Sequence, residues 1–147
     1  MYKQRFKHYI KHYILKTFFF TISERHFYAK LHHIVKEYYS WRYKIFSHVR
    51  LRDIIDVHKD DIQKRTYENK IARRHLDFVL VDKFNYYRPV LAIELNWSSH
   101  DNEESKEKDN YKLEVLKEAG IPLLFFRNGD ERKPELIKEK IGWELKK

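Results

Sequence analysis

Apolar positions along the chain change their spacing several times, and each change predicts a new element. The capping-box residues Thr21 and Glu24 predict the start of a helix, and apolar residues at helical spacing extend it to Tyr38. Residues 43–51 alternate like a strand, whereas residues 52–72 are mixed and charged, which indicates a loop with a short helix. The helical stripe consists of Phe27, Leu31, Ile34, Val35 and Tyr38, and one face of the strand consists of Ile45, Ser47, Val49 and Leu51.

The second half of the chain predicts further strands and helices. Two apolar segments are joined by a turn-like segment, which is typical of a hairpin. A polar loop then leads into a helix that should end at Gly120, because glycine readily adopts the left-handed conformation that follows a helix. The predicted strands cover residues 75–82, 90–96 and 121–127, and the predicted helices cover roughly residues 103–119 and 135–145.

The basic and aromatic residues 3–19 also carry apolar side chains at helical spacing, so they predict a further helix at the N-terminal end. The resulting order is α, α, β, β, β, α, β, α. This order favours an α/β (α+β) fold with a mixed sheet and helices on both faces. No repeat or Pro/Gly-rich linker divides the chain. We therefore expect a basic helical arm over residues 1–20 and one domain over residues 21–147.

Composition adds a polyanionic partner to this picture. The formal net charge is +9, and residues 1–50 hold 11 of the Lys and Arg residues, 2 acidic residues and 14 of the 24 aromatic residues. Nucleic acid or an acidic membrane surface would suit such an arm. The lack of cysteine excludes a disulfide scaffold, a thiolate zinc site and a cysteine nucleophile. The apolar stretch 13–22 is too short to span a membrane and lacks a signal-peptide cleavage site, so we expect a cytoplasmic protein.

Two carboxylates interrupt the apolar hairpin. If the hairpin turns symmetrically about Asn85 and Tyr86, Asp77 lies opposite Glu94, and opposed Cβ atoms are about 4.5–5.5 Å apart. A divalent cation such as Mg²⁺ or Mn²⁺ would relieve their repulsion. Alternatively, Arg73 or Arg74 pairs with one carboxylate, or the register differs and both are solvated. The same symmetry pairs Val81 with Val90, Val79 with Ala92 and His75 with Asn96.

Four other polar residues fall where they could reach this pair. Lys112 lies within an apolar helical arc of Tyr111, Val115, Leu116 and Ala119, and Asp109 lies at the edge of that arc. An ordinary surface pair between Asp109 and Lys112 is the alternative. Glu24 shares the arc of the first helix stripe and should point toward the sheet, although the capping box already explains its presence. His100 follows Glu94 by six residues, where it could contact phosphate or move a proton.

The segments ARRHLDFVLVD, VLAIELNWSSHD and DNYKLEVLKEAGIPLL together resemble an uncharacterised bacterial family of the restriction-endonuclease-like, PD-(D/E)xK superfamily, related to very-short-patch-repair endonucleases. The segment SERHFYAKL also resembles that family's opening helix, and the likeness extends over residues 21–127. The resemblance implies an αβββαβ core with a mixed sheet. It also implies that Asp77 and Glu94 bind the metal, that Glu24 contributes from the outer helix, and that His100, Asp109 and Lys112 complete the site.

Position 96 departs from the pattern of the superfamily. Asn96 stands where the superfamily motif has lysine and where the nearer family has aspartate. The resemblance then implies that Lys112 supplies the missing cation from the helix. We expect a Mg²⁺- or Mn²⁺-dependent endonuclease that hydrolyses DNA, in repair or restriction. The alternatives are a nucleic-acid-binding module of the same fold without catalysis, and a membrane-surface or protein-docking role for residues 1–20.

Overall fold

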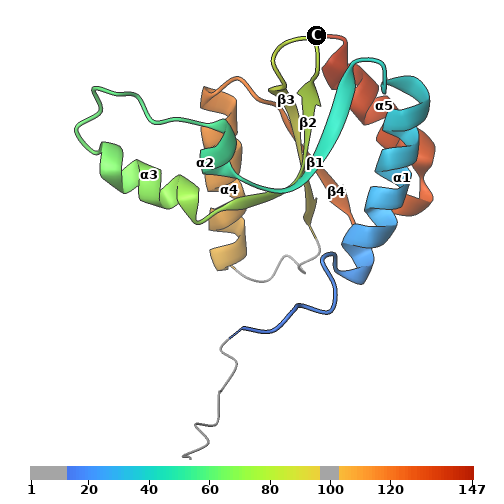
Figure 1. Ribbon diagram of the computed structural model, residues 1–147, viewed down its shortest axis with the longest axis horizontal. Coiled ribbons are helices and arrows are strands. Elements are labelled where there is room, and N and C mark those ends of the chain that lie inside the picture. Colours follow the sequence, from blue (N-terminus) through green and yellow to red (C-terminus); the bar gives the residue numbers. More distant parts are fainter. Residues whose placement is uncertain (1–12, 97–102) are drawn as a thin grey trace, which may run out of the picture.

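The computed structural model describes residues 13–96 and 103–147 (Figure 1). Within those ranges, helices and strands follow nearly the predicted order. In chain order the elements are α1 (Ile22–Tyr38), β1 (Tyr43–Arg50), α2 (Leu51–Ile54), α3 (Lys64–Ala72), β2 (His75–Asp82), β3 (Arg88–Asn96), α4 (Glu103–Glu118), β4 (Leu123–Arg127), the 3-10 helix η1 (Asp130–Arg132) and α5 (Pro134–Leu145). No helix in these ranges is long and apolar enough to cross a membrane.

The strands form one mixed sheet in the order β1-β2-β3-β4. The first three strands are antiparallel, and β4 runs parallel to β3 after the α4 crossover. Figure 1 shows α1 and α5 on one side of the sheet and α2, α3 and α4 on the other. The predicted mixed α/β sheet with helices on both faces is therefore confirmed.

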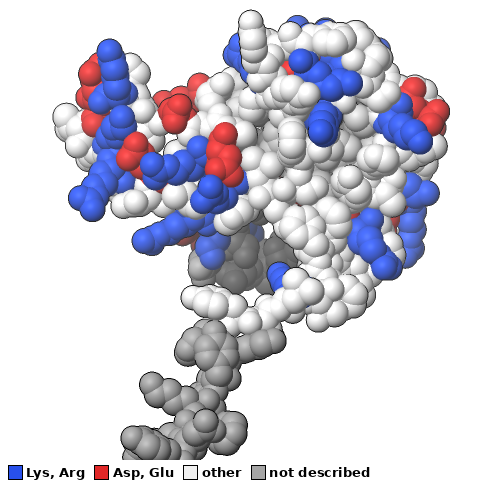
Figure 2. All heavy atoms as spheres, in the orientation of Figure 1, with Lys and Arg blue, Asp and Glu red and all other residues white. Residues whose placement is uncertain are grey.

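The edge strand β1 faces the viewer in Figure 1, and Figure 2 shows that the surface over it is largely uncharged. Lys and Arg instead gather over α3, at the left of Figure 2, and around the margins of the molecule. Acidic side chains lie among the basic ones there, so this view shows no single continuous basic surface.

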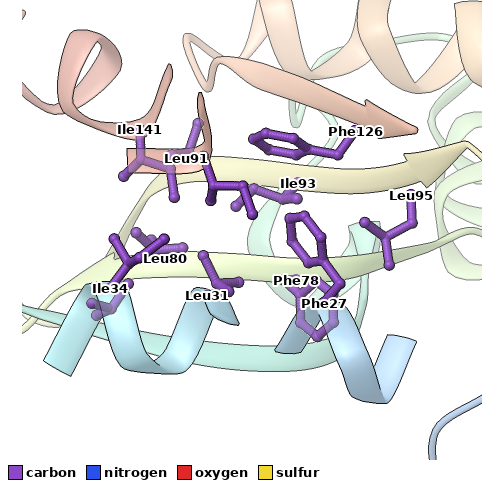
Figure 3. Close-up of a cluster of buried hydrophobic side chains, with 12 residues drawn as sticks. Phe27, Leu31, Ile34, Phe78, Leu80, Leu91, Ile93, Leu95, Phe126 and Ile141 are labelled. Atoms are coloured by element: carbon purple, nitrogen blue, oxygen red, sulfur yellow. The ribbon is translucent and has the colours of Figure 1, made fainter. Parts of the chain in front are cut away.

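A hydrophobic core lies on each face of the sheet. Figure 3 shows the larger one, in which Phe27 of α1 packs against Phe78 of β2, with ring centroids 5.9 Å apart. The opposite cluster joins Val79 of β2 and Ala92 of β3 to Leu116 of α4. Because both faces are covered, β2 and β3 are apolar over most of their length, and a carboxylate within them is conspicuous.

Local signals in the sequence explain two helix ends. Thr21 accepts from the N–H of Glu24, and the Glu24 carboxylate accepts from the N–H of Thr21, which completes the predicted capping box of α1. At the end of α4, Gly120 has φ +75°. Its N–H donates to the carbonyl of Lys117, and that of Ile121 donates to the carbonyl of Leu116, which forms a Schellman motif.

Three local predictions were wrong. The helix predicted over residues 3–19 is absent from residues 13–20, and residues 3–12 lie outside the described residues. Phe19 and Phe20 pack on the domain, but Tyr13 and Leu15 are more than 90% exposed, and a short helix without tertiary contacts along its length is unstable. Leu51 begins α2 rather than ending the strand, because Asp53 accepts from the N–H of Arg50 and caps a helical turn there. Ala119, expected on the buried arc of α4, is exposed beside the helix end.

The hairpin register is correct in its centre and wrong near its turn. Val79 pairs with Ala92 as expected, but Val81 pairs with Pro89 instead of Val90. The register shifts between Leu80 and Val81. Proline has no N–H to donate to the strand ladder, so regular pairing cannot simply continue through Pro89.

Candidate functional site

Asp77 and Glu94 lie side by side at the end of β2 and β3 that is farthest from their hairpin turn. The pairing of Phe78 with Ile93, continued by one residue, places Asp77 opposite Glu94. The two side chains are within hydrogen-bonding contact of each other. Glu94 is buried, at 7% exposure, and Asp77 is partly buried. The structure thus brings together the two carboxylates that the sequence singled out.

The environment of Asp77 favours its protonated form. Burial is the main cause of its raised pKa, and the nearby negative charge of Glu24 adds to the rise. The N–H of Leu95 opposes the rise by donating to Asp77 Oδ2 over 2.7 Å. The positive charge of Lys112 and the side-chain contact with Glu94 also lower the pKa of Asp77. An additional positive charge beside Asp77 would therefore stabilise its ionised form.

Lys112 of α4 supplies one positive charge to the pair. Its Nζ lies 2.7 Å from Glu94 Oε1, and the two side chains are only 15% and 9% exposed. Of the alternatives to this contact, a partnership of Arg74 with the carboxylates is not what the structure shows. The Arg74 guanidinium instead lies 4.1 Å above the ring of Tyr111 and donates to the carbonyl of Lys70.

Glu24 reaches the site from the first turn of α1. Besides closing the capping box, its Oε2 lies 3.4 Å from Nε2 of His48, and its charge acts on Asp77. The Glu24 side chain is 14% exposed. The capping role and the orientation toward the sheet, which the sequence left as alternatives, therefore occur together in this structure.

His48 of β1 is a site residue that the sequence reasoning missed. Its φ of +53° lies in the left-handed region, where a non-glycine residue is strained. The ring stacks on Phe19, with centroids 4.5 Å apart, and meets Phe20 edge-on at 5.5 Å. The signal for His48 is the pairing of β1 with β2, because the register that joins Ser47 to Phe78 places His48 opposite Asp77.

The remaining sequence candidates lie outside the described part of the site. His100 falls within residues 97–102, and the side chains of Asn96 and Asp109 are also outside the described part, although both residues belong to regular elements. Within residues 13–96 and 103–147, no three His, Asp or Glu side chains are already arranged around one point like the ligands of a metal ion.

The donors that are present still suit a hard divalent cation. Glu24, Asp77 and Glu94 contribute three carboxylates, against which Lys112 sets one ammonium group. Mg²⁺ is commonly held by one or two carboxylates and completes its coordination with water and substrate phosphate oxygens. Asp77 and Glu94 could supply those two carboxylates, so a bound ion need not find three protein ligands in advance.

Comparison with known proteins identifies a family. A family model described as "Protein of unknown function (DUF2726)" matches residues 16–145. No curated protein and no solved structure matches the chain significantly. The match covers α1 and the strands that carry the candidate site, together with α4.

Proposed function

The chain belongs to the DUF2726 family, and we propose that it is a metal-dependent endonuclease of the PD-(D/E)xK type that hydrolyses phosphodiester bonds in DNA, in repair or restriction. One observation carries this proposal. Asp77 of β2 lies against Glu94 of β3, Lys112 of α4 pairs with Glu94, and the charge of Glu24 on α1 acts on Asp77. Phosphodiester hydrolysis needs carboxylates that bind a metal ion and a cation that stabilises the negative charge developing on the phosphate.

The proposed metal is Mg²⁺ or Mn²⁺, and its ligands would be Asp77 and Glu94. When bound there, the ion would polarise a phosphate oxygen and lower the pKa of a bound water. The support lies in the donors themselves, which are hard oxygens, and in the raised pKa of Asp77, which burial and the charge of Glu24 produce. A site with this excess of negative charge is stabilised by a divalent cation.

Lys112 is the residue placed to stabilise negative charge on the phosphate. Lys112 belongs to helix α4, and Glu94 holds its ammonium group at the site, so the positive charge is in place before substrate arrives. The superfamily motif places such a lysine at position 96, where this chain has Asn96. Lys112 would replace that lysine from the opposite side of the site, because α4 packs over the strand that carries Glu94.

Glu24 and His48 would act on the orientation of the site rather than on the phosphate itself. Thr21 and His48 both contact the Glu24 carboxylate, which leaves it little freedom to rotate. A fixed Glu24 keeps negative charge next to Asp77, which raises the pKa of Asp77 and also strengthens the attraction of the site for a divalent cation. His100 and Asp109 stay predictions for the remaining positions.

The test is cleavage of supercoiled plasmid and of single-stranded DNA in millimolar Mg²⁺ or Mn²⁺, with EDTA as the metal-free reference. Asp77→Asn and Glu94→Gln should each lower the cleavage rate by about 100-fold or more, because a site of this kind depends on both ligands. Glu118→Gln removes the same charge from the exposed surface of α4 and should leave the rate unchanged. Cleavage that persists in both site variants would refute the assignment, whereas metal-independent DNA binding without cleavage would select the non-catalytic alternative.

A further inference from the structure

A second unusual region lies at the opposite end of the sheet, where residues 83–87 connect β2 to β3. Phe84, Tyr86 and Tyr87 project there with exposures of 70%, 98% and 52%. Trp41, in the loop between α1 and β1, is 63% exposed and lies 5.8 Å from the ring of Phe84. Since Asp77 and Asp82 are five residues apart on one strand, this aromatic group lies roughly 17 Å or more from the carboxylates.

The backbone at Tyr86 and Tyr87 is strained. Their φ values are +49° and +58°, and the N–H of Arg88 donates to the carbonyl of Asn85 over 2.8 Å, as in a type I′ turn. Such turns favour Asn-Gly, because a side chain is disfavoured at positive φ. Tyr86 is almost fully exposed, so packing of its ring does not offset the strain at that position. Strain without a packing benefit points to a role outside the fold.

The aromatic group is held in place by contacts to the neighbouring loop. The N–H of Lys83 donates to the carbonyl of Arg42 over 2.8 Å, and the Lys83 ammonium group donates to the carbonyl of Ser40. Arg42 in turn pairs with the buried carboxylate of Asp82 at 2.7 Å. The exposed rings therefore stand on a fixed base, which lowers the entropy lost when a partner binds.

A basic groove of about 980 Å³ adjoins the hairpin that carries three of these rings. Asn85 and Arg88, which flank the two tyrosines, line it. Its two carboxylates are both paired, since Asp82 contacts Arg42 and Glu144 contacts Lys147 at 3.1 Å. Figure 2 shows basic side chains at the upper edge of the molecule, where Figure 1 places this hairpin beside the C-terminal end. The cations that line the groove are Arg42, Arg88, Lys117, Lys146 and Lys147.

We propose that this end of the sheet binds an unpaired nucleic-acid strand, whose bases stack on the exposed rings while its phosphates follow the groove. Aromatic rings beside a basic groove are the combination that binds single strands, because every base offers a face for stacking. A duplex would not fit, since its bases are already stacked on one another. An anionic bilayer is less suited, because its surface is flat whereas the cations here line a concave groove.

This binding surface shares no residue with the carboxylate site, and the proposal does not depend on hydrolysis. It is tested with the full chain in EDTA, by fluorescence anisotropy of a labelled oligonucleotide of about 20 nucleotides. The oligonucleotide is supplied as single-stranded DNA, as RNA of the same sequence and as duplex DNA. Comparison of the two single-stranded probes shows whether the surface prefers DNA or RNA. The duplex probe tests whether binding requires unpaired bases.

Two paired substitutions and two controls make the test decisive. Trp41→Ala with Phe84→Ala should weaken single-strand binding by about tenfold or more, since each stacked base contributes severalfold to affinity. Tyr86→Asn with Tyr87→Gly should weaken it similarly while the thermal midpoint is unchanged or higher, because the turn receives the residues it favours. Tyr67→Ala on α3 and Asp77→Asn should both bind like the original protein.

Unchanged affinity in both double variants would overturn the proposal, as would equal binding of single strand and duplex. Binding to anionic phospholipid vesicles with none to oligonucleotides would also overturn it, in favour of a membrane surface. Failure of the original protein to bind a single strand refutes this surface alone, because cleavage at the carboxylate site is measured separately. Loss of cleavage in Asp77→Asn with full single-strand binding would separate the two sites.

Discussion

The contact between Lys112 and Glu94 gives the sharpest prediction about the site. Lys112→Met keeps most of the length and the apolar stem but removes the ammonium group, whose Nζ lies 2.7 Å from Glu94 Oε1. With side chains only 15% and 9% exposed, the carboxylate that is left would face Asp77 without its cation. Breaking a buried pair costs about 3–5 kcal/mol, and the partial exposure of Lys112 places this one near 3 kcal/mol.

Urea unfolding at pH 7 measures this change. In thermal unfolding, the same loss of about 3 kcal/mol corresponds to a fall in Tm of roughly 9 °C for a chain of this length. The double variant Lys112→Met with Glu94→Gln is the matched control, and it should recover about half of the loss because the negative charge that Lys112 balanced is removed as well. Added Mg²⁺ should stabilise Lys112→Met more than the original protein, since the site then lacks its own cation. A single variant within about 0.5 kcal/mol of the original protein would show that the pair is solvated and would refute the reasoning.

Three further predictions concern the site and its support. The raised pKa of Asp77 means that its ionised carboxylate opposes folding at neutral pH, so the free energy of unfolding should rise as the pH falls through that raised pKa. Asp77→Asn should flatten this rise and should be at least as stable as the original protein at pH 7, as measured by urea midpoints at several pH values. His48→Asn suits the positive φ, but its shorter side chain should no longer reach Glu24. The free energy of unfolding should therefore stay within about 1 kcal/mol of the original value while plasmid cleavage falls about tenfold, and equal cleavage would contradict this. Gly120→Ala should lower stability by about 1 kcal/mol in thermal unfolding, from backbone strain alone, because nothing lies within 4 Å of the added Cβ.

The fold could be predicted largely from local patterns. The apolar stripe of α1, its capping box and the glycine after α4 each leave a signal in a few neighbouring residues. The strands were equally visible, because β2 and β3 are buried on both faces and therefore read as apolar runs. What these signals share is that the physical cause and the sequence pattern lie within the same element.

The errors arose where the cause lies elsewhere in the chain. Residues 13–20 carry a helical pattern, but whether they form a helix depends on a surface to pack on, which the sequence does not reveal. The register shift beside Pro89 depends on which N–H groups the partner strand needs. His48 was missed because its strained φ and its contact with Glu24 arise only when β1, β2 and α1 are assembled.

The carboxylate site shows the same division. Asp77, Glu94 and Lys112 could be predicted because each places a charge where an apolar residue is expected, and a buried charge requires a partner. The dual contact of Glu24, with the capping box and with His48, could only be stated as alternatives before the helix was seen against the sheet. A residue on a strand edge, such as His48, interrupts no apolar run and so gives no such signal.

The central claim is that Asp77 and Glu94 hold a divalent cation, and anomalous diffraction from a crystal soaked in Mn²⁺ tests it most directly. We predict an anomalous peak between the two carboxylates, within coordination distance of both, with Lys112 Nζ displaced from Glu94 Oε1 but still beside the site. The peak should be absent from an Asp77→Asn crystal treated in the same way. A fully soaked crystal with no peak there, and with the Lys112–Glu94 ion pair intact, would contradict the claim.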